Sequence, residues 1–144
     1  MKKIIWVTVF SLILLFAFLF NEFLILNVEV LSMDAYIVEK EIGFNLDSDK
    51  IHFGNVPMFS NGAYREIMVT NIYGENIKIF LSDLGKIDEY VYFEIDGSYY
   101  EKYNFILGEN ETKTFKVVFD NDDLPLGYYD GEIKIVVRKF FKFS

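Results

Sequence analysis

The chain of 144 residues contains no cysteine and one histidine, and its 14 Lys and Arg are outnumbered by 22 Asp and Glu. Without cysteine, a disulfide framework and a thiolate metal site are excluded. Because phosphate binding requires a surplus of basic residues, nucleic acid is not expected as a partner. The sequence also contains none of the catalytic or phosphate-binding motifs, such as a phosphate-binding loop, G-x-S-x-G or H-E-x-x-H. The only histidine, His52, alternates with the apolar Ile51 and Phe53, so we expect it on a solvent face. We therefore expect neither an enzyme nor a cofactor.

Apolar residues, by contrast, make up 52% of the chain, which excludes disorder for most of it. They are concentrated in a run over 4–20 that is interrupted only by Thr8 and Ser11. Continued to residue 26 as a helix, the run covers about 35 Å, enough to cross a bilayer with tilt. Because it is apolar on all faces, it is not typical of a helix in a soluble core. We predict that residues 4–26 contact membrane lipid.

This segment is either an uncleaved anchor or a cleaved secretory signal, and Lys2 and Lys3 suit both. Residues 21–27, which follow the apolar run, include none of the small residues that a signal peptidase requires, and this favours the anchor. We therefore predict a cell-membrane anchor over 1–27 with a cytoplasmic N-terminus, a short tether over 28–35 and an extracytoplasmic domain over 36–144.

Within 36–144, apolar and polar residues alternate with a period of two, which is the pattern of half-buried strands. The clearest stretches are 42–46, 51–53, 67–69, 77–81, 91–95, 115–119 and 129–137. Seven or eight strands without intervening helices predict an all-β fold, an immunoglobulin-like antiparallel β-sandwich preceded by one transmembrane helix. A small closed barrel is the structural alternative.

Short motifs sharpen this fold prediction. Pro125, Gly127 and Tyr129 lie at alternate positions before the last strand and resemble the tyrosine corner of immunoglobulin-like sandwiches, with an ordinary buried aromatic as the alternative. The sequences IHFGNV (51–56), REIMVTN (65–71), LGENET (107–112) and GYYDGEI (127–133) resemble landmarks of the same domains, in particular the major-sperm-protein and ASH-type sandwiches. The resemblance implies an adhesive or scaffolding module. By topology, an anchor plus an outward sandwich is also similar to archaeal flagellar stator proteins.

Two turns carry candidate sites. Asp120, Asp122 and Asp123 offer carboxylates to extracellular calcium, although turn chemistry also accounts for them. Asn110 begins the sequon Asn110-Glu111-Thr112, and a turn outside the membrane is the context that N-glycosylation requires.

The end of the chain reverses the acidic trend. It carries Arg138, Lys139, Phe140, Phe141, Lys142 and Phe143. We expect either a last strand with a basic outer face or an exposed strand that docks an acidic partner by edge pairing. An odd number of strands would place this run away from the membrane, and an even number would place it near the headgroups.

The leading functional expectation is a single-pass membrane protein whose outward domain binds another protein or a surface layer. The alternatives are a calcium- or ligand-binding module, and an accessory subunit of a membrane complex in which Asn21 and Glu22 meet a partner helix.

Overall fold

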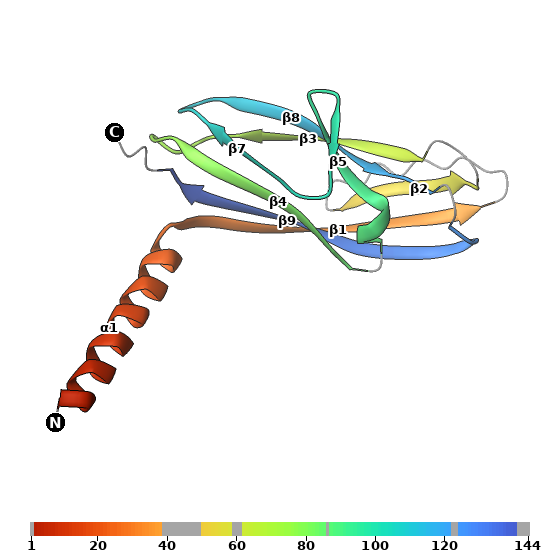
Figure 1. Cartoon of the computed structure of the whole chain (residues 1–144). Coiled ribbons are helices and arrows are strands. Elements are labelled where there is room, and N and C mark those ends of the chain that lie inside the picture. Colours follow the sequence, from red (N-terminus) through yellow and green to blue (C-terminus); the bar gives the residue numbers. More distant parts are fainter. Residues whose placement is uncertain (1, 39–49, 59–61, 86, 122–123, 141–144) are drawn as a thin grey trace.

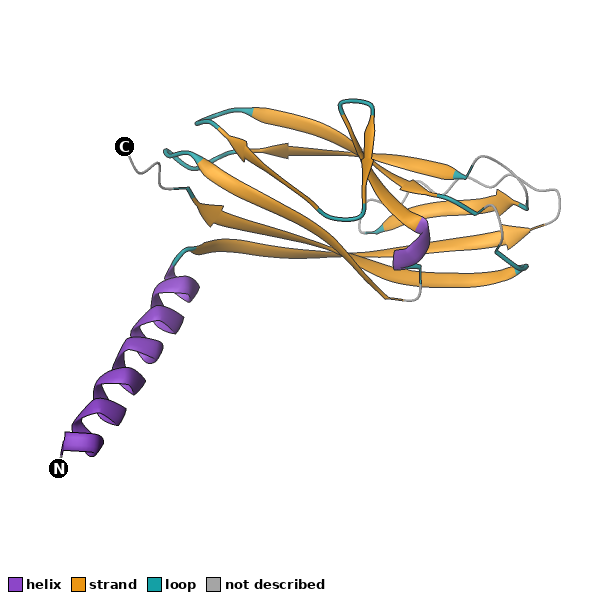
Figure 2. Cartoon of the chain, in the orientation of Figure 1, coloured by secondary structure: helices purple, strands orange, loops and turns teal. Residues whose placement is uncertain are grey.

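The computed structural model describes residues 2–38, 50–58, 62–85, 87–121 and 124–140. Helix α1 (Lys2–Phe23) projects from a domain built of strands, as Figures 1 and 2 show. The strands are β1 (Ile25–Val38), β2 (Ile51–Pro57), β3 (Ala63–Thr70), β4 (Ile77–Gly85), β5 (Val91–Ile95), β6 (Ser98–Tyr100), β7 (Tyr103–Leu107), β8 (Thr112–Phe119) and β9 (Gly127–Lys139). One turn of 3-10 helix, η1 (Asp88–Tyr90), precedes β5.

The strands form two sheets, with the orders β2-β1-β9-β4-β7 and β3-β8-β5-β6. All neighbouring strands are antiparallel except β1 and β2, which run parallel. The predicted β-sandwich with one N-terminal helix is therefore confirmed, with nine strands in the described residues rather than seven or eight. Because the sheets are separate and each has its own edges, the closed barrel is excluded.

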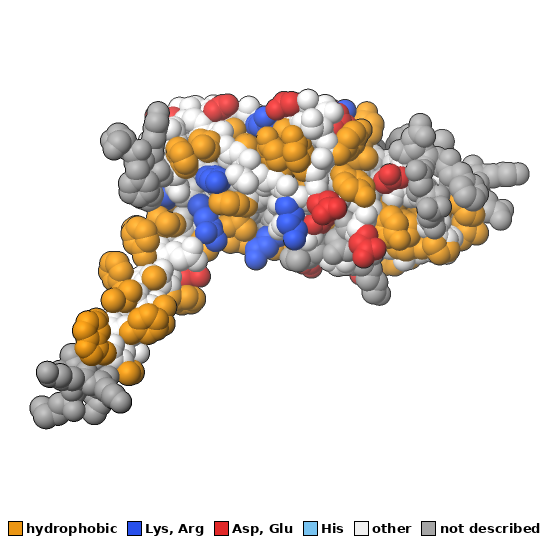
Figure 3. All heavy atoms as spheres, viewed as in Figure 1, with side chains coloured by type: hydrophobic (Ala, Val, Ile, Leu, Met, Phe, Trp, Pro, Cys, Tyr) orange, Lys and Arg blue, Asp and Glu red, His pale blue; other side chains and the backbone are white. Residues whose placement is uncertain are grey.

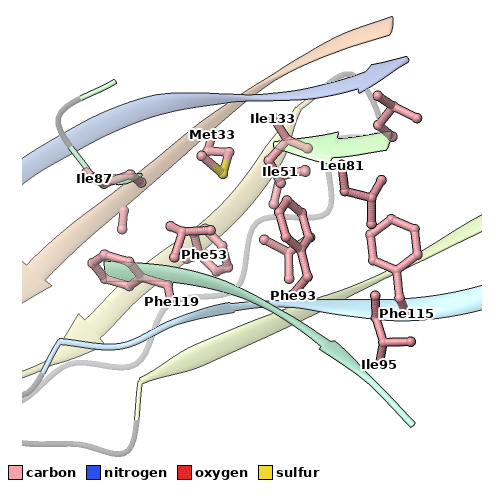
Figure 4. Packing of buried hydrophobic residues seen from close by; sticks show 14 of the residues in the cluster. Met33, Ile51, Phe53, Leu81, Ile87, Phe93, Ile95, Phe115, Phe119 and Ile133 are labelled. Carbon is pink, nitrogen blue, oxygen red and sulfur yellow. The ribbon is translucent and has the colours of Figure 1, made fainter. Parts of the chain in front are cut away.

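Alternation of side chains along the strands creates one core between the sheets. Every second residue of β5 and β8 points inward, and Phe93, Val117 and Phe119 are fully buried. The Phe53 and Phe119 rings stack with centroids 5.3 Å apart, which joins the two sheets at the centre of the cluster in Figure 4. Burial of these aromatic side chains, together with the aliphatic residues around them, stabilises the sandwich.

The tether predicted over 28–35 is wrong, because these residues lie inside β1. They pair with β9 in an antiparallel ladder that runs from Ile25 opposite Arg138 to Ile37 opposite Gly127. Val28 and Val30 point to the outer face and are exposed, whereas Met33 and Ala35 point inward and are buried. The alternation of apolar and polar residues therefore changes phase between Val30 and Leu31, and the stretch does not show the single apolar face of a half-buried strand. The strand predicted over 42–46 lies outside the described residues.

Candidate functional site: the end of the sandwich next to the helix

Helix α1 carries a window, Trp6–Phe23, with a mean hydropathy of 1.9 and no buried residues. Its exposed apolar side chains cover the helix in Figure 3. A helix of this length and composition is able to cross a membrane, as an anchor or as a signal sequence.

The helix joins the sandwich through hydrogen bonds rather than through a linker. Only Leu24 separates α1 from β1, and its carbonyl oxygen accepts a hydrogen bond from the Lys139 backbone N–H at 2.9 Å. Arg138 Nη1 donates to Asn21 Oδ1, in the last turn of the helix, at 3.2 Å. The end of β9 therefore braces both the helix and the start of β1, an arrangement visible in Figure 1.

Further contacts hold the two basic residues at this junction. The Arg138 guanidinium lies 5.4 Å from the centroid of the Phe80 ring. Lys139 Nζ is 3.1 Å from Glu75 Oε1 and 5.7 Å from the centroid of Phe23, in the helix. Lys and Arg side chains gather over β4 and β9 near the helix in Figure 3. The junction is thus a basic region in an acidic chain.

The prediction that the C-terminal run is an exposed edge strand is wrong, because β9 lies inside the five-stranded sheet. Arg138 and Lys139 belong to β9, which lies between β1 and β4, so their backbone is not available for edge pairing. Phe140 is half-buried, and its N–H donates to Asn76 O at 3.2 Å. Phe141, Lys142 and Phe143 lie outside the described residues.

β9 ends beside residue 25, so the described part of this run lies at the end of the sandwich that carries the helix. The parity of the described strands does not decide this position, because β1 and β2 run parallel and consecutive strands do not always reverse direction.

Sequence reasoning assigned no role to Asn71, which is fully buried at the same end. Its Nδ2 donates to the carbonyl oxygens of Glu75, Leu107 and Gly108 at 2.9, 3.3 and 2.8 Å. Its Oδ1 accepts from the Tyr73 N–H at 2.9 Å. One amide thus joins the loop between β3 and β4 to the turn between β7 and β8, because buried polar groups require partners. Asn71 lies in the REIMVTN landmark, which was the available signal.

That turn presents Asn110, the sequon residue. Asn110 is exposed and has a φ of 60°, a left-handed conformation that asparagine tolerates. The Glu111 N–H donates to Gly108 O at 3.1 Å, and the Gly108 N–H donates to Glu111 Oε2 at 2.6 Å. The turn is accessible from solvent, and glycosylation of Asn110 stays a prediction.

Two other predicted positions lie at a distance from the helix. Tyr129 Oη donates to Pro125 O at 2.9 Å, which is the hydrogen bond expected of a tyrosine corner. The Asp120 N–H donates to Tyr90 O at 2.7 Å, whereas Asp122 and Asp123 lie outside the described residues. In the part of the chain that the structure describes, no group of three His, Asp or Glu side chains is placed to hold a metal. Calcium binding by this turn therefore stays a prediction.

His52 faces away from Ile51 and Phe53, as its alternation predicted, but its side chain is largely covered rather than exposed to solvent. The parallel pairing of β1 and β2 sets it opposite Asp34, and its Nδ1 lies 2.6 Å from Asp34 Oδ1. The two side chains are only 13% and 16% exposed. The contact of His52 with Asp34 joins β2 to β1.

Near the junction, the space between the sheets is open to solvent. A cavity of about 280 Å³, which we call the inter-sheet groove, separates the first half of β1 from β3. Its lining comprises Asn27, Glu29, Leu31, Ile67, Met68, Val69, Thr70, Ile72, Tyr73, Ile77, Ile79, Ile135 and Val137. Most of these side chains are apolar, and Ile72 at its margin is 80% exposed. The sequence did not predict this groove, because the groove arises where the long strand β1 continues past the end of the shorter strand β2.

A β-sandwich carried directly on an apolar helix is the class of protein that the fold defines. The chain matches no family model and no curated protein.

Proposed function

We propose that the protein is a single-pass membrane protein whose immunoglobulin-like sandwich lies outside the cytoplasm and binds another protein or a surface layer, without catalysis. The observation that carries this proposal is the braced junction, in which Arg138 and Lys139 bond to Asn21 and Leu24. A domain held in this way has a restricted orientation to the bilayer, which suits a scaffold that presents one surface to a partner.

The same junction supports an uncleaved anchor. Cleavage of a signal between residues 21 and 27 would remove the Asn21 acceptor of Arg138, and cleavage after Leu24 would also remove the acceptor of the Lys139 N–H. Lys2 and Lys3 favour a cytoplasmic N-terminus.

The resemblance to major-sperm-protein and ASH-type domains supports a scaffolding role, and the single-anchor topology is similar to that of archaeal flagellar stator proteins. An accessory subunit that uses Asn21 against a partner helix is less favoured, because Asn21 Oδ1 already accepts a hydrogen bond from Arg138.

The proposal is tested on intact cells with the full chain tagged at its C-terminus. We expect the chain to stay in the membrane pellet after alkaline carbonate extraction, to keep its N-terminal residues by mass spectrometry, and to lose the tag when protease is added outside the cells. A chain shortened beyond residue 27, or a tag that is protected until the cells are lysed, would refute the proposal.

A further inference from the structure

We infer that the inter-sheet groove accepts an extended strand of a partner protein, which adds to the free edge of β1 along residues 25–32. This inference rests on the proposed function as a protein-binding module and names the binding surface and the form of the partner.

The edge of β1 is the first element of this site. β2 pairs with β1 only between Met33 and Val38, whereas β9 pairs with β1 from Ile25 onward. Within the described residues, 25–32 therefore has a hydrogen-bonded neighbour on one side only. Eight residues of strand present about 26 Å of unpaired backbone. Because β9 already holds this stretch extended, an added strand pairs with it without first ordering it.

The groove beside this edge is the second element. A strand that continued the line of β2 would point every second side chain between the sheets, onto Leu31, Ile67 and Ile135. Its other side chains would lie beside Val28 and Val30 on the outer face, which are 44% and 48% exposed. The added strand would therefore cover the half-buried Leu31 and Ile67 on one face and the exposed Val28 and Val30 on the other.

β2 itself shows what an occupant requires. In the half of the sandwich where β2 is present, its inward residues Ile51, Phe53 and Val56 are buried in the core. The groove is the continuation of that position into the half where β2 is missing. An occupant therefore needs large apolar residues among its inward positions, as β2 has.

Charge selects further among such strands. Glu29 is exposed on the β1 wall of the groove, with Asn27 two residues earlier on the same face. The chain carries a net charge of −8, so an acidic strand would be repelled. The structure thus favours a partner strand with Lys or Arg at the inward position beside Glu29 and apolar residues at its other inward positions.

The test measures amide hydrogen exchange of the full chain in detergent micelles. The probe is an eight-residue peptide whose inward positions carry Ile, Phe and Val together with one Lys that faces Glu29, and whose outward positions carry Thr. The matched control is the same peptide methylated on alternate backbone nitrogens, which keeps every side chain but loses the donors needed for pairing. We expect the probe to slow exchange at least tenfold at the amides of 25–32 that point away from β9, and the methylated peptide to leave them unchanged.

Two pairs of variants locate the binding. Ile72→Asp and Glu29→Arg change the groove and are expected to weaken binding of the probe at least fivefold. Leu126→Asp and Glu132→Arg make the same chemical changes at exposed positions outside the groove and are expected to leave binding unchanged. If the control variants weaken binding of the probe as much as the groove variants do, the probe does not bind in the groove and the inference is wrong.

Protection of these amides without the probe would also overturn the inference. If that protection rises with protein concentration, a second copy of this chain covers the edge. If it is independent of concentration, another segment of the same chain does so. Neither result alters the fractionation and protease assays, so failure of this inference is distinguishable from failure of the proposed function.

Discussion

Replacement of Asn71 by Ala is predicted to be among the most damaging changes of a polar residue in this chain. The Asn71 side chain makes four hydrogen bonds while fully buried. A net hydrogen bond contributes about 1 kcal/mol, and a buried group left unpaired costs about 1–3 kcal/mol. Some of the freed carbonyls lie near solvent, so we expect a loss of about 3–4 kcal/mol from the free energy of unfolding. A loss of this size is a large share of the 5–15 kcal/mol typical of a domain.

The assay is thermal unfolding of the full chain in detergent, followed by far-ultraviolet circular dichroism. A loss of about 3–4 kcal/mol corresponds to a fall in Tm of about 10–15 °C for a domain of this size. Asn71→Asp separates hydrogen bonding from packing, because a carboxylate has nearly the same shape but donates no hydrogen bond to the carbonyls of Glu75, Leu107 and Gly108. We expect Asn71→Asp to be at least as destabilising as Asn71→Ala, and Asn104→Ala, at an exposed position of β7, to shift Tm by less than about 2 °C. An Asn71→Asp variant as stable as the wild type would refute this account.

Three further predictions concern other parts of the sandwich. Tyr129→Phe removes the hydrogen bond to Pro125 O and should lower the free energy of unfolding, measured in urea, by about 1 kcal/mol. An unchanged urea midpoint would show that this hydrogen bond does not stabilise the sandwich. Gly62→Ala should cost more than about 2 kcal/mol, because Gly62 has a φ of +75° and a Cβ would lie 2.0 Å from Phe119 O; normal expression and Tm would contradict this. The hydrogen bond to Glu94, and the negative charges nearby, raise the pKa of Lys116 above its ordinary value of about 10.5. The stabilisation from this lysine is therefore complete below about pH 10.5 and is lost as the pH rises through the raised pKa, so the stability difference between wild type and Lys116→Met should shrink only above that pH.

Local patterns predicted the strands whose two faces differ in polarity. In β5 and β8 every second residue is buried, and alternation in the sequence shows this directly. Local patterns did not predict the start of β1, because Val28 and Val30 are apolar although they lie on an exposed face. These residues also follow closely on the apolar helix, so the composition does not mark where the strand begins. The position of β9 between β1 and β4 depends on pairing between residues that are far apart in the sequence, such as Ile25 with Arg138 and Gly85 with Gly131, which periodicity does not encode.

The candidate site was less predictable for the same reason. Composition and the apolar run indicated the helix, but the brace from Arg138 to Asn21 spans 117 positions of sequence. Alternation correctly turned His52 away from Ile51 and Phe53, yet only the parallel register with β1 brings Asp34 against it. The groove exists because β2 is half as long as β1, and no property of a single residue reports that difference.

The pairing of the first strand with the last has a consequence for biosynthesis. β1 leaves the ribosome directly after the helix, but β9 follows roughly 90 residues later, which takes about 5–20 s at ordinary rates of translation. During that interval β1 lacks the neighbour that holds it along its whole length. In the anchored chain that we propose, neighbouring nascent chains in one membrane would expose the same strand. Premature termination before residue 127 would leave a chain without its central strand, a product suited to aggregation.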